Sequence, residues 1–125
     1  MDITQDIADA KYTITSYNAD CIFVNKEPYH QSLLICPESL ISPWDVSELS
    51  QLNETTLTPI IQYQPEIVII GTGDQLVLPE PKVIAYFAKH KIGLETMNTP
   101  AACRTYGILA AEARKVMTGI IFNAV

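Results

Sequence analysis

Residues 65–74 read Pro-Glu-Ile-Val-Ile-Ile-Gly-Thr-Gly-Asp, and this stretch decides the fold. The unbroken β-branched run from Ile67 to Ile70 has no polar side, so a strand built from it must be covered on both faces. Strands of this kind lie in the middle of a sheet. We therefore predict a central strand here and expect Ile69 to be among the most buried residues.

The turn that follows this strand is the first candidate for a binding feature. Gly71 and Gly73 accept positive φ angles and carry no Cβ, so Gly71-Thr72-Gly73 can turn sharply and expose backbone N–H groups and the Asp74 carboxylate. Ligands of open α/β sheets tend to bind at the carboxyl ends of central strands. The alternative is that the glycines only permit a tight turn and that Asp74 bonds to local backbone.

The second half of the chain alternates helices and strands. A helix from near Thr56 would hold Pro59 in its first turn, where a missing N–H does no harm. A later helix begins after Asn98, which is its N-cap. Strands joined by a crossing helix run parallel. The predicted elements are a helix from near Thr56, the central strand, a helix from Pro81 to a stop at Gly93, a strand over 94–97, a helix from Thr99 to near Arg114 and a strand over 116–122.

The first half shows short alternating segments separated by turn residues. A strand over 11–16, a turn over 17–20, a strand over 21–24, a turn over 25–28 and a strand over 29–36 form a three-stranded antiparallel meander, with a further short strand at Leu40-Ile41. We expect residues 1–10 to be loosely ordered and residues 11–125 to form a single domain. The fold class is α/β with three layers, a mixed central sheet, a β-α-β-α-β second half and this antiparallel meander.

Composition excludes several classes of partner. The chain has 125 residues and a formal net charge of −6, whereas nucleic acids and anionic membranes are bound through clustered Lys and Arg. Its three cysteines lack the spacing of a disulfide framework or a zinc site, so we expect no metal. No secretory signal and no apolar run of about 18 residues is present, so the sequence predicts no integral membrane segment and a cytoplasmic location.

A second group of candidate residues lies at the start of the helix over 99–114. If this helix follows the strand next to the central one, its N-terminus at Thr99 should lie beside the Gly71–Asp74 turn, and free N–H groups there favour a carboxylate or phosphate. Cys103 lies in the first turns, where the helix dipole and Arg104 could stabilise a thiolate. The alternative is that Cys103 is a small apolar core residue.

No catalytic set emerges from these residues. The Gly71-Thr72-Gly73 turn lacks the Gly-Lys-Ser/Thr of a phosphate-binding loop and the third glycine of the dinucleotide-binding motif, so we expect no cofactor. His30 lies among polar residues of a predicted strand and His90 at a predicted helix end, so neither has an evident nucleophile to activate. The sequence therefore does not favour an enzyme.

Several motifs resemble one known family over nearly the whole chain. They are Glu66 to Gly73, the strand Gly93 to Met97, Thr99-Pro100-Ala101-Ala102 through Tyr106 to Leu109-Ala110-Ala111-Glu112, and Tyr29, Ser32-Leu33-Leu34 and Trp44 in the first half. They resemble the small α/β domain family that contains mitochondrial NADH dehydrogenase (complex I) assembly factor 3, an adipogenesis-associated protein and many bacterial members. Gly107 and Ala113 depart from the pattern, which has Asn and Gly at these places.

The resemblance implies a mixed sheet flanked by helices and an antiparallel β layer, and it implies no established enzymatic activity. Two function classes follow. The first is a non-catalytic protein-interaction module, an assembly or chaperone-like factor whose partner is another protein. The alternative is a small-molecule or anion-binding protein, or a cryptic enzyme, that uses the Gly71–Asp74 turn and the N-terminus of the helix over 99–114.

Overall fold

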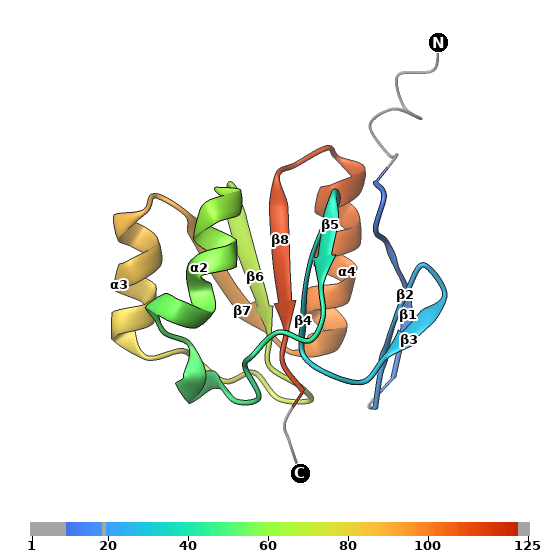
Figure 1. The fold of residues 1–125 in the computed structure, drawn as a ribbon, viewed down its shortest axis with the longest axis horizontal. Coiled ribbons are helices and arrows are strands. Elements are labelled where there is room, and N and C mark those ends of the chain that lie inside the picture. The colour runs from blue at the N-terminus through green and yellow to red at the C-terminus, as the bar shows by residue number, and fades with distance from the viewer. Residues whose placement is uncertain (1–9, 19, 123–125) are drawn as a thin grey trace.

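A five-stranded mixed sheet forms the centre of the molecule (Figure 1). The computed structural model describes residues 10–18 and 20–122. The sheet has the order β5-β4-β8-β6-β7, in which β6 runs parallel to β7 and β8, and β4 runs antiparallel to β8 and β5. Its strands are β4 (Leu33–Cys36), β5 (Ser39–Ile41), β6 (Ile67–Gly71), β7 (Gly93–Met97) and β8 (Val116–Ile120). The predicted α/β fold, with its β-α-β-α-β second half, is confirmed.

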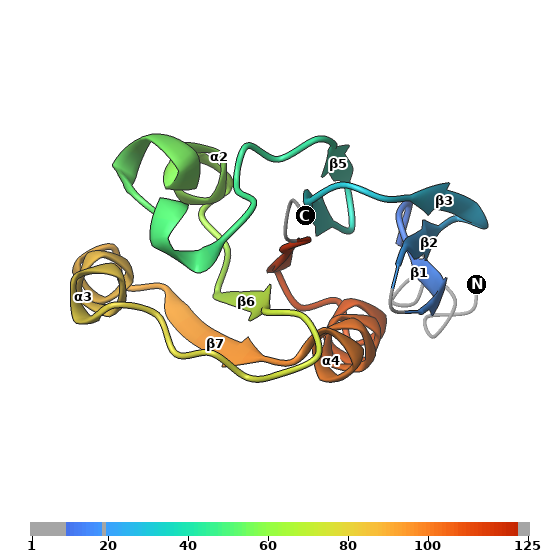
Figure 2. The ribbon, with the colours of Figure 1, turned by 90° about the horizontal axis from the view of Figure 1, so that it is seen from below.

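Helices and a second sheet cover the two faces of this central sheet (Figure 2). The helices are α2 (Glu54–Tyr63), α3 (Pro81–Lys89) and α4 (Thr99–Ala111), and a 3₁₀ turn, η1 (Leu49–Gln51), precedes α2. Val68 and Ile70 pack on the α2 and α3 side, whereas Ile69 packs on the α4 side. This alternation is why the β6 run has no polar face: each of its faces borders an apolar core.

The first half of the chain differs from the predicted meander in one respect. β1 (Ile14–Tyr17), β2 (Ile22–Val24) and β3 (Glu27–Tyr29) form a separate three-stranded antiparallel sheet. The prediction that residues 29–36 form its third strand is wrong, because Leu33–Cys36 is β4 of the central sheet. All four β4 residues are buried, and such a run needs cover on both faces.

A tight turn explains the earlier start of β3. Asn25 and Lys26 have φ angles of 52° and 71°, the paired positive values of a two-residue hairpin turn. The strand therefore restarts at Glu27. Pro28 lies on an outer strand whose only paired neighbour in the described part of the chain is β2. The predicted loose start at residues 1–10 falls, apart from Ala10, outside the part of the chain that the structure describes.

Three helix boundaries also differ from prediction. α3 ends at Lys89, whereas the predicted stop, Gly93, is the first residue of β7. α2 begins at Glu54, two residues earlier than expected, because the Asn53 side chain caps it by accepting the Thr56 N–H at 3.0 Å. Pro59 consequently lies beyond the first turn. α4 ends at Ala111 rather than near Arg114, and Ala113 follows in the left-handed region with φ 59°.

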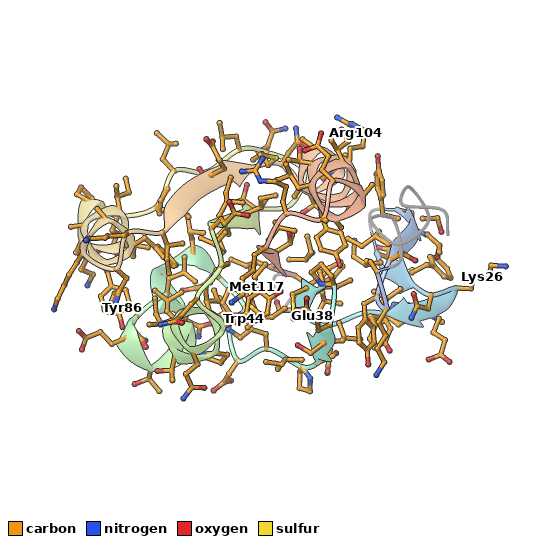
Figure 3. All side chains as sticks on the ribbon, turned by 90° about the horizontal axis from the view of Figure 1, so that it is seen from above. Lys26, Glu38, Trp44, Tyr86, Arg104 and Met117 are labelled. Carbon is orange, nitrogen blue, oxygen red and sulfur yellow. The ribbon has the colours of Figure 1, made fainter. Side chains whose placement is uncertain are left out.

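Trp44 closes the core on the α2 side of the sheet, where Met117 also lies (Figure 3). Its ring packs directly on Gly119 of β8, and a Cβ at position 119 would come within 2.6 Å of the Trp44 Cζ3 atom. Its Nε1–H donates to the Thr56 carbonyl oxygen at 2.9 Å. One side chain thus joins the β5–η1 connection, the central sheet and α2.

Thr118 offers a stability prediction. Its hydroxyl is fully buried in β8 and has no hydrogen-bond partner among the described residues. Valine has the same shape without the hydroxyl, and an unpaired buried polar group costs about 1–3 kcal/mol. We expect Thr118→Val to raise the free energy of unfolding by about 1 kcal/mol, and the melting temperature by roughly 3–6 °C.

The matched control is Thr99→Val, which removes a buried hydroxyl that does have a partner, the Gly73 N–H. This variant should lose stability in the same thermal and urea unfolding experiments. A lower melting temperature for Thr118→Val than for the parent would contradict the prediction.

Candidate functional site

The turn after β6 is packed against the start of α4. A Cβ at Gly71 would lie 3.0 Å from the Ile120 side chain and 3.1 Å from the Ala102 side chain, so a larger residue there would push the helix away. Gly73 has a φ of +93°, which side-chain-bearing residues rarely adopt. Both glycines therefore have structural reasons to be present.

Internal hydrogen bonds hold this turn. The Gly73 N–H donates to Thr99 Oγ1 at 2.9 Å, and the Thr99 N–H donates to the Gly73 carbonyl oxygen at 2.8 Å. The Thr72 N–H donates to the Met97 carbonyl oxygen at 3.0 Å. Thr72 Oγ1 donates to the Gln75 carbonyl oxygen at 2.6 Å and accepts the Val77 N–H at 3.2 Å. The turn and the helix start are thus adjacent, as their place after parallel strands requires.

The first turn of α4 has no free donor for an anion. The Thr99 N–H is bonded to Gly73, Pro100 has no N–H, and the Ala101 N–H donates to the Asn98 side chain at 2.9 Å. The Ala102 N–H donates to the Asn98 carbonyl oxygen. Because these donors are satisfied internally, the geometry favours a structural role for the helix start over the binding of a carboxylate or phosphate.

A cavity of about 540 Å³ opens beside this turn, at the carboxyl edge of the parallel strands. Its lining residues are Tyr17, Asn18, Asp20, His30, Gly73, Asp74, Thr99, Pro100, Ile121 and Phe122. Of the residues singled out in the sequence, Gly73, Asp74 and Thr99 line it. Within the described ranges, no three His, Cys, Asp or Glu side chains lie close enough together to hold a metal ion.

Four lining residues were not predicted from the sequence. Tyr17, Asn18 and Asp20 come from the end of β1 and the turn after it, and His30 directly follows β3. Asn18 showed a recognisable turn signal, and its side chain accepts the Asp20 and Cys21 N–H groups. No local sequence pattern indicated that the β1–β2 hairpin lies beside the carboxyl edge of the parallel strands.

Cys103 and Arg104 point in different directions. Cys103 is only 4% exposed and belongs to the core on the α4 side. Arg104 lies on the outer surface of α4 (Figure 3), and its Nη1 donates to the Tyr17 hydroxyl at 3.1 Å. Burial raises the pKa of the Cys103 thiol to about 12, and the opposing effect of the Arg104 charge is smaller. Of the two alternatives for Cys103, the structure favours the small apolar core residue over a stabilised thiolate.

The raised pKa of Cys103 predicts slow alkylation. At pH 8 we expect iodoacetamide to label Cys103 in the folded protein at least about tenfold more slowly than in urea, as followed by peptide mass spectrometry. The thiol is neutral in the fold but ionises near pH 8.5 when unfolded, so its contribution to stability is present below that pH and lost as pH rises toward 12. Equal labelling rates in the folded and unfolded protein would contradict the assignment.

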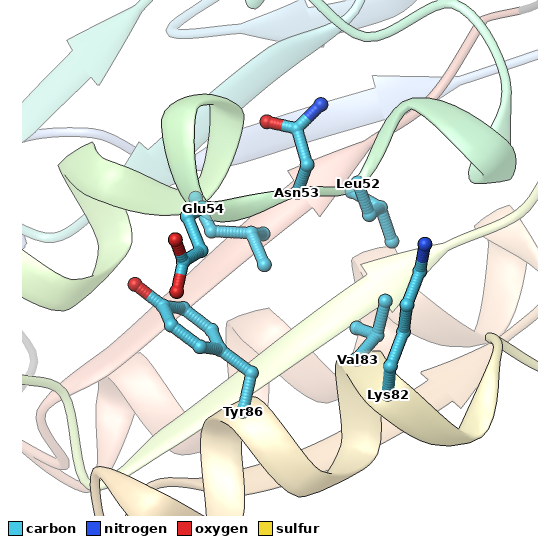
Figure 4. A pocket seen from close by; sticks show the side chains of 7 residues that line it. Leu52, Asn53, Glu54, Lys82, Val83 and Tyr86 are labelled. Atoms are coloured by element: carbon cyan, nitrogen blue, oxygen red, sulfur yellow. The ribbon is translucent and has the colours of Figure 1, made fainter.

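A second cavity lies between the N-terminal halves of α2 and α3 (Figure 4). It has a volume of about 290 Å³ and is lined by Leu52, Asn53, Glu54, Leu57, Lys82, Val83 and Tyr86. The apolar side chains form its wall, whereas Glu54 and Lys82 bring charges from opposite helices. We call this cavity the α2–α3 groove. No pattern in the sequence predicted this cavity.

The loop that leads from β6 to α3 is apolar and exposed. Leu76, Val77 and Leu78 are 55%, 49% and 73% exposed, whereas Pro79 beside them is buried. We call these three residues the Leu76–Leu78 loop. It runs along the same end of the molecule as η1 and the starts of α2 and α3 (Figure 1).

The match to a family model covers residues 14–121, nearly all of the described chain. The family is described as "Protein of unknown function (DUF498/DUF598)". The chain belongs to this family. The matched region runs from β1 to just after β8, so it includes both sheets and the helices α2, α3 and α4.

Curated relatives carry two kinds of name. NADH dehydrogenase [ubiquinone] 1 alpha subcomplex assembly factor 3 of Drosophila melanogaster is 34% identical over 70% of this chain and 46% of its own length. The human protein of that name is 27% identical over 95% of this chain and 65% of its own. The 13 kDa major membrane protein of Francisella tularensis is 26% identical over 97% of this chain and 99% of its own length. The chain thus spans about half to two thirds of these two assembly factors.

Solved structures share the fold. The NMR structure of a Xanthomonas campestris protein is 31% identical, with a TM-score of 0.83 over 97% of this chain and 92% of that one. A Bordetella parapertussis protein with a known crystal structure is 29% identical, with a TM-score of 0.82 over 90% of this chain and 96% of that one. None of the helices in the described part of this chain is both long and apolar enough to cross a membrane.

Proposed function

We propose that the chain is a non-catalytic protein-interaction module that acts as an assembly or chaperone-like factor. The observation that carries this proposal is the Leu76–Leu78 loop. Three consecutive large apolar side chains are about half or more exposed, which is unfavourable in water unless a partner covers them. Single exposed apolar residues are ordinary, but a consecutive run on one loop is a feature of binding surfaces.

The surroundings of the loop support a protein partner. Two residues separate the loop from α3, which begins at Pro81. Lys82 and Val83 in the first turn of α3 line the α2–α3 groove. Loop and groove together offer apolar contact with charged groups around it, the usual composition of a protein interface. The names of the assembly-factor relatives point to the same class of function, and the internally bonded turn after β6 offers no catalytic set.

The proposal can be tested by photo-crosslinking. A benzophenone side chain at position 78 should capture a small, reproducible set of proteins in cells that naturally make this chain. Leu76→Ser combined with Leu78→Ser should abolish the capture measured from a second label at position 77. The matched control is Ile108→Ser, which removes an equally exposed apolar side chain on α4 and should leave capture unchanged.

The outcome of this experiment distinguishes two versions of the function. Capture of respiratory NADH dehydrogenase subunits would support the specific assembly role, and capture of other defined proteins would support a more general chaperone-like role. Absence of any product that depends on Leu76 and Leu78 would overturn the interaction module. A cytoplasmic location stays a prediction, which fractionation of the same cells would test.

The cavity beside Gly73 and Asp74 supports a second candidate function, the binding of a small molecule. Asp20 and Asp74 place two carboxylates at a cavity whose wall includes Pro100, Ile121 and Phe122. Because the helix donors are occupied, this chemistry suits a cationic, partly apolar molecule better than an anion. A thermal-shift screen of amines, anions and nucleotides, with Asp74→Ala as control, tests it, and no ligand-dependent shift would exclude this function.

A further inference from the structure

One edge of the central sheet is open along β7. β7 is the last strand in the sheet order, with β6 as its only paired neighbour in the described part of the chain. The Gly93 N–H donates to the Glu66 carbonyl oxygen, and the Met97 carbonyl oxygen accepts the Thr72 N–H. The N–H and C=O groups of successive residues in a strand point to opposite sides. Gly93, Glu95 and Met97 therefore bond to β6, whereas the N–H and C=O groups of Leu94 and Thr96 point away from the sheet.

We infer that this edge is a docking site for an extended segment of a partner protein, which adds to the sheet as a sixth strand beside β7. The inference rests on the proposed function, because it needs a protein partner, and it names the part of that partner which binds. Outward N–H and C=O groups at strand spacing are matched by the backbone of another strand. A globular side-chain surface or a small molecule would leave them unpaired.

The two faces of β7 determine the side chains that the added strand should carry. Leu94 packs toward the α3 side, and Glu95 points to the opposite face and is exposed. A residue beside Glu95 therefore gains most from a positive charge, since opposite charges on neighbouring strands stabilise each other. We expect a Lys or Arg there.

The α3 side calls for an apolar residue. Val83 and Phe87 of α3 face the core, and Tyr86 turns to the α2–α3 groove. Helical spacing then directs Ile84 away from α2, toward the open edge, and its side chain is 49% exposed. Figure 2 shows α3 at the β7 end of the sheet. An apolar residue of the added strand would cover Ile84, so the predicted pattern is alternating apolar and basic.

A second copy of this chain fits the edge less well. In the antiparallel pairing that joins Leu94 of each copy to Thr96 of the other, the two Glu95 residues stand directly opposite. Their Cα atoms would be about 4.5 Å apart, and like charges so placed are destabilising. Charge complementarity thus favours a basic segment of a different protein.

The direction of the backbone groups can be tested first. Thr96→Pro removes an outward N–H, which an edge strand tolerates, whereas Glu95→Pro removes an N–H bonded to β6. We expect the melting temperature to fall by less than about 4 °C for Thr96→Pro and by more than about 10 °C for Glu95→Pro. Equal losses would show that the edge is not open and would overturn the inference.

Binding is then measured with a blocked peptide, Thr-Val-Lys-Val-Lys-Val-Thr, titrated to about 2 mM against the full chain by NMR. We expect the Leu94 and Thr96 amide signals to shift and their hydrogen exchange to slow. Binding should be absent for Thr96→Pro and for a peptide with N-methylated backbone. Glu95→Lys should weaken binding about fivefold, and a peptide with Glu in place of Lys should bind that variant better.

Each other outcome counts against strand addition. Binding that is unchanged in Thr96→Pro, or no shift at Leu94 and Thr96 at the highest concentration, would overturn it. A concentration-dependent dimer that Thr96→Pro abolishes would assign the edge to a second copy instead. If crosslinking at position 78 still captures its partners in Thr96→Pro, the interaction function stands and only strand addition fails. If the peptide binds at β7 but position 78 captures nothing, strand addition stands and the interaction function argued from the Leu76–Leu78 loop fails.

Discussion

Ile69→Asp is expected to abolish folding. Ile69 is completely buried at the centre of β6, so the change removes a packed apolar side chain at a cost of about 2–5 kcal/mol and buries an unpaired carboxylate at a cost of several more. The sum is comparable with the whole stability of a domain of this size, about 5–15 kcal/mol. The variant should be insoluble, or should lack a cooperative thermal transition by circular dichroism.

The control for this experiment is Ile84→Asp, which makes the same chemical change on the exposed side of α3. It should melt within a few degrees of the parent, since exposed substitutions rarely change stability by more than about 0.5 kcal/mol. A soluble Ile69→Asp protein with a parent-like transition would mean that β6 is not a central strand.

Gly119→Ala is expected to lower the free energy of unfolding by about 1–3 kcal/mol, the usual cost of inserting a methyl group into a packed core. The new Cβ would lie 2.6 Å from one Trp44 ring atom and 3.0 Å from another. Trp44 can retreat only by weakening its bond to the Thr56 carbonyl oxygen and its packing on α2. Urea unfolding monitored by the fluorescence of this single tryptophan measures the loss directly.

Gly107→Ala is the matched control, because a Cβ at Gly107 meets no atom within 4 Å. Gly107 lies inside α4, where alanine is favoured over glycine by roughly 0.5–1 kcal/mol, so this variant should gain stability. In a double-mutant cycle, Trp44→Phe should reduce the cost of Gly119→Ala. Equal effects at the two glycines would rule out the contact with Trp44.

Elements were predicted well where local chemistry decides them. The Ile67–Ile70 run and its glycines identified β6, Pro81 marked the first residue of α3, and Asn98 marked the cap of α4. Predictions failed where the local sequence was compatible with two different strand pairings. Residues 29–36 could continue a meander or enter another sheet, and only the cover available on both faces of Leu33–Cys36 decides between them.

The candidate site shows the same division. The sequence indicated that the Gly71–Asp74 turn and the start of α4 would be adjacent, because both follow parallel strands. It could not indicate that the Thr99 hydroxyl and the Asn98 side chain accept hydrogen bonds from the donors there. Nor could it indicate that the β1–β2 hairpin supplies three of the residues that line a neighbouring cavity. Those facts depend on side-chain positions set by packing between distant segments.

The sequence by itself determined which strand is central, where α3 and α4 begin and that the second half is a parallel β-α-β-α-β unit. These properties follow from hydrophobic periodicity, proline and capping chemistry, which act over a few residues. Only the tertiary structure decided the exposure of Leu76–Leu78, the open edge of β7, the burial of Cys103 and the contact between Trp44 and Gly119. Each of these depends on which distant segment covers a surface, and solvent exposure is a property of the assembled layers rather than of any local pattern.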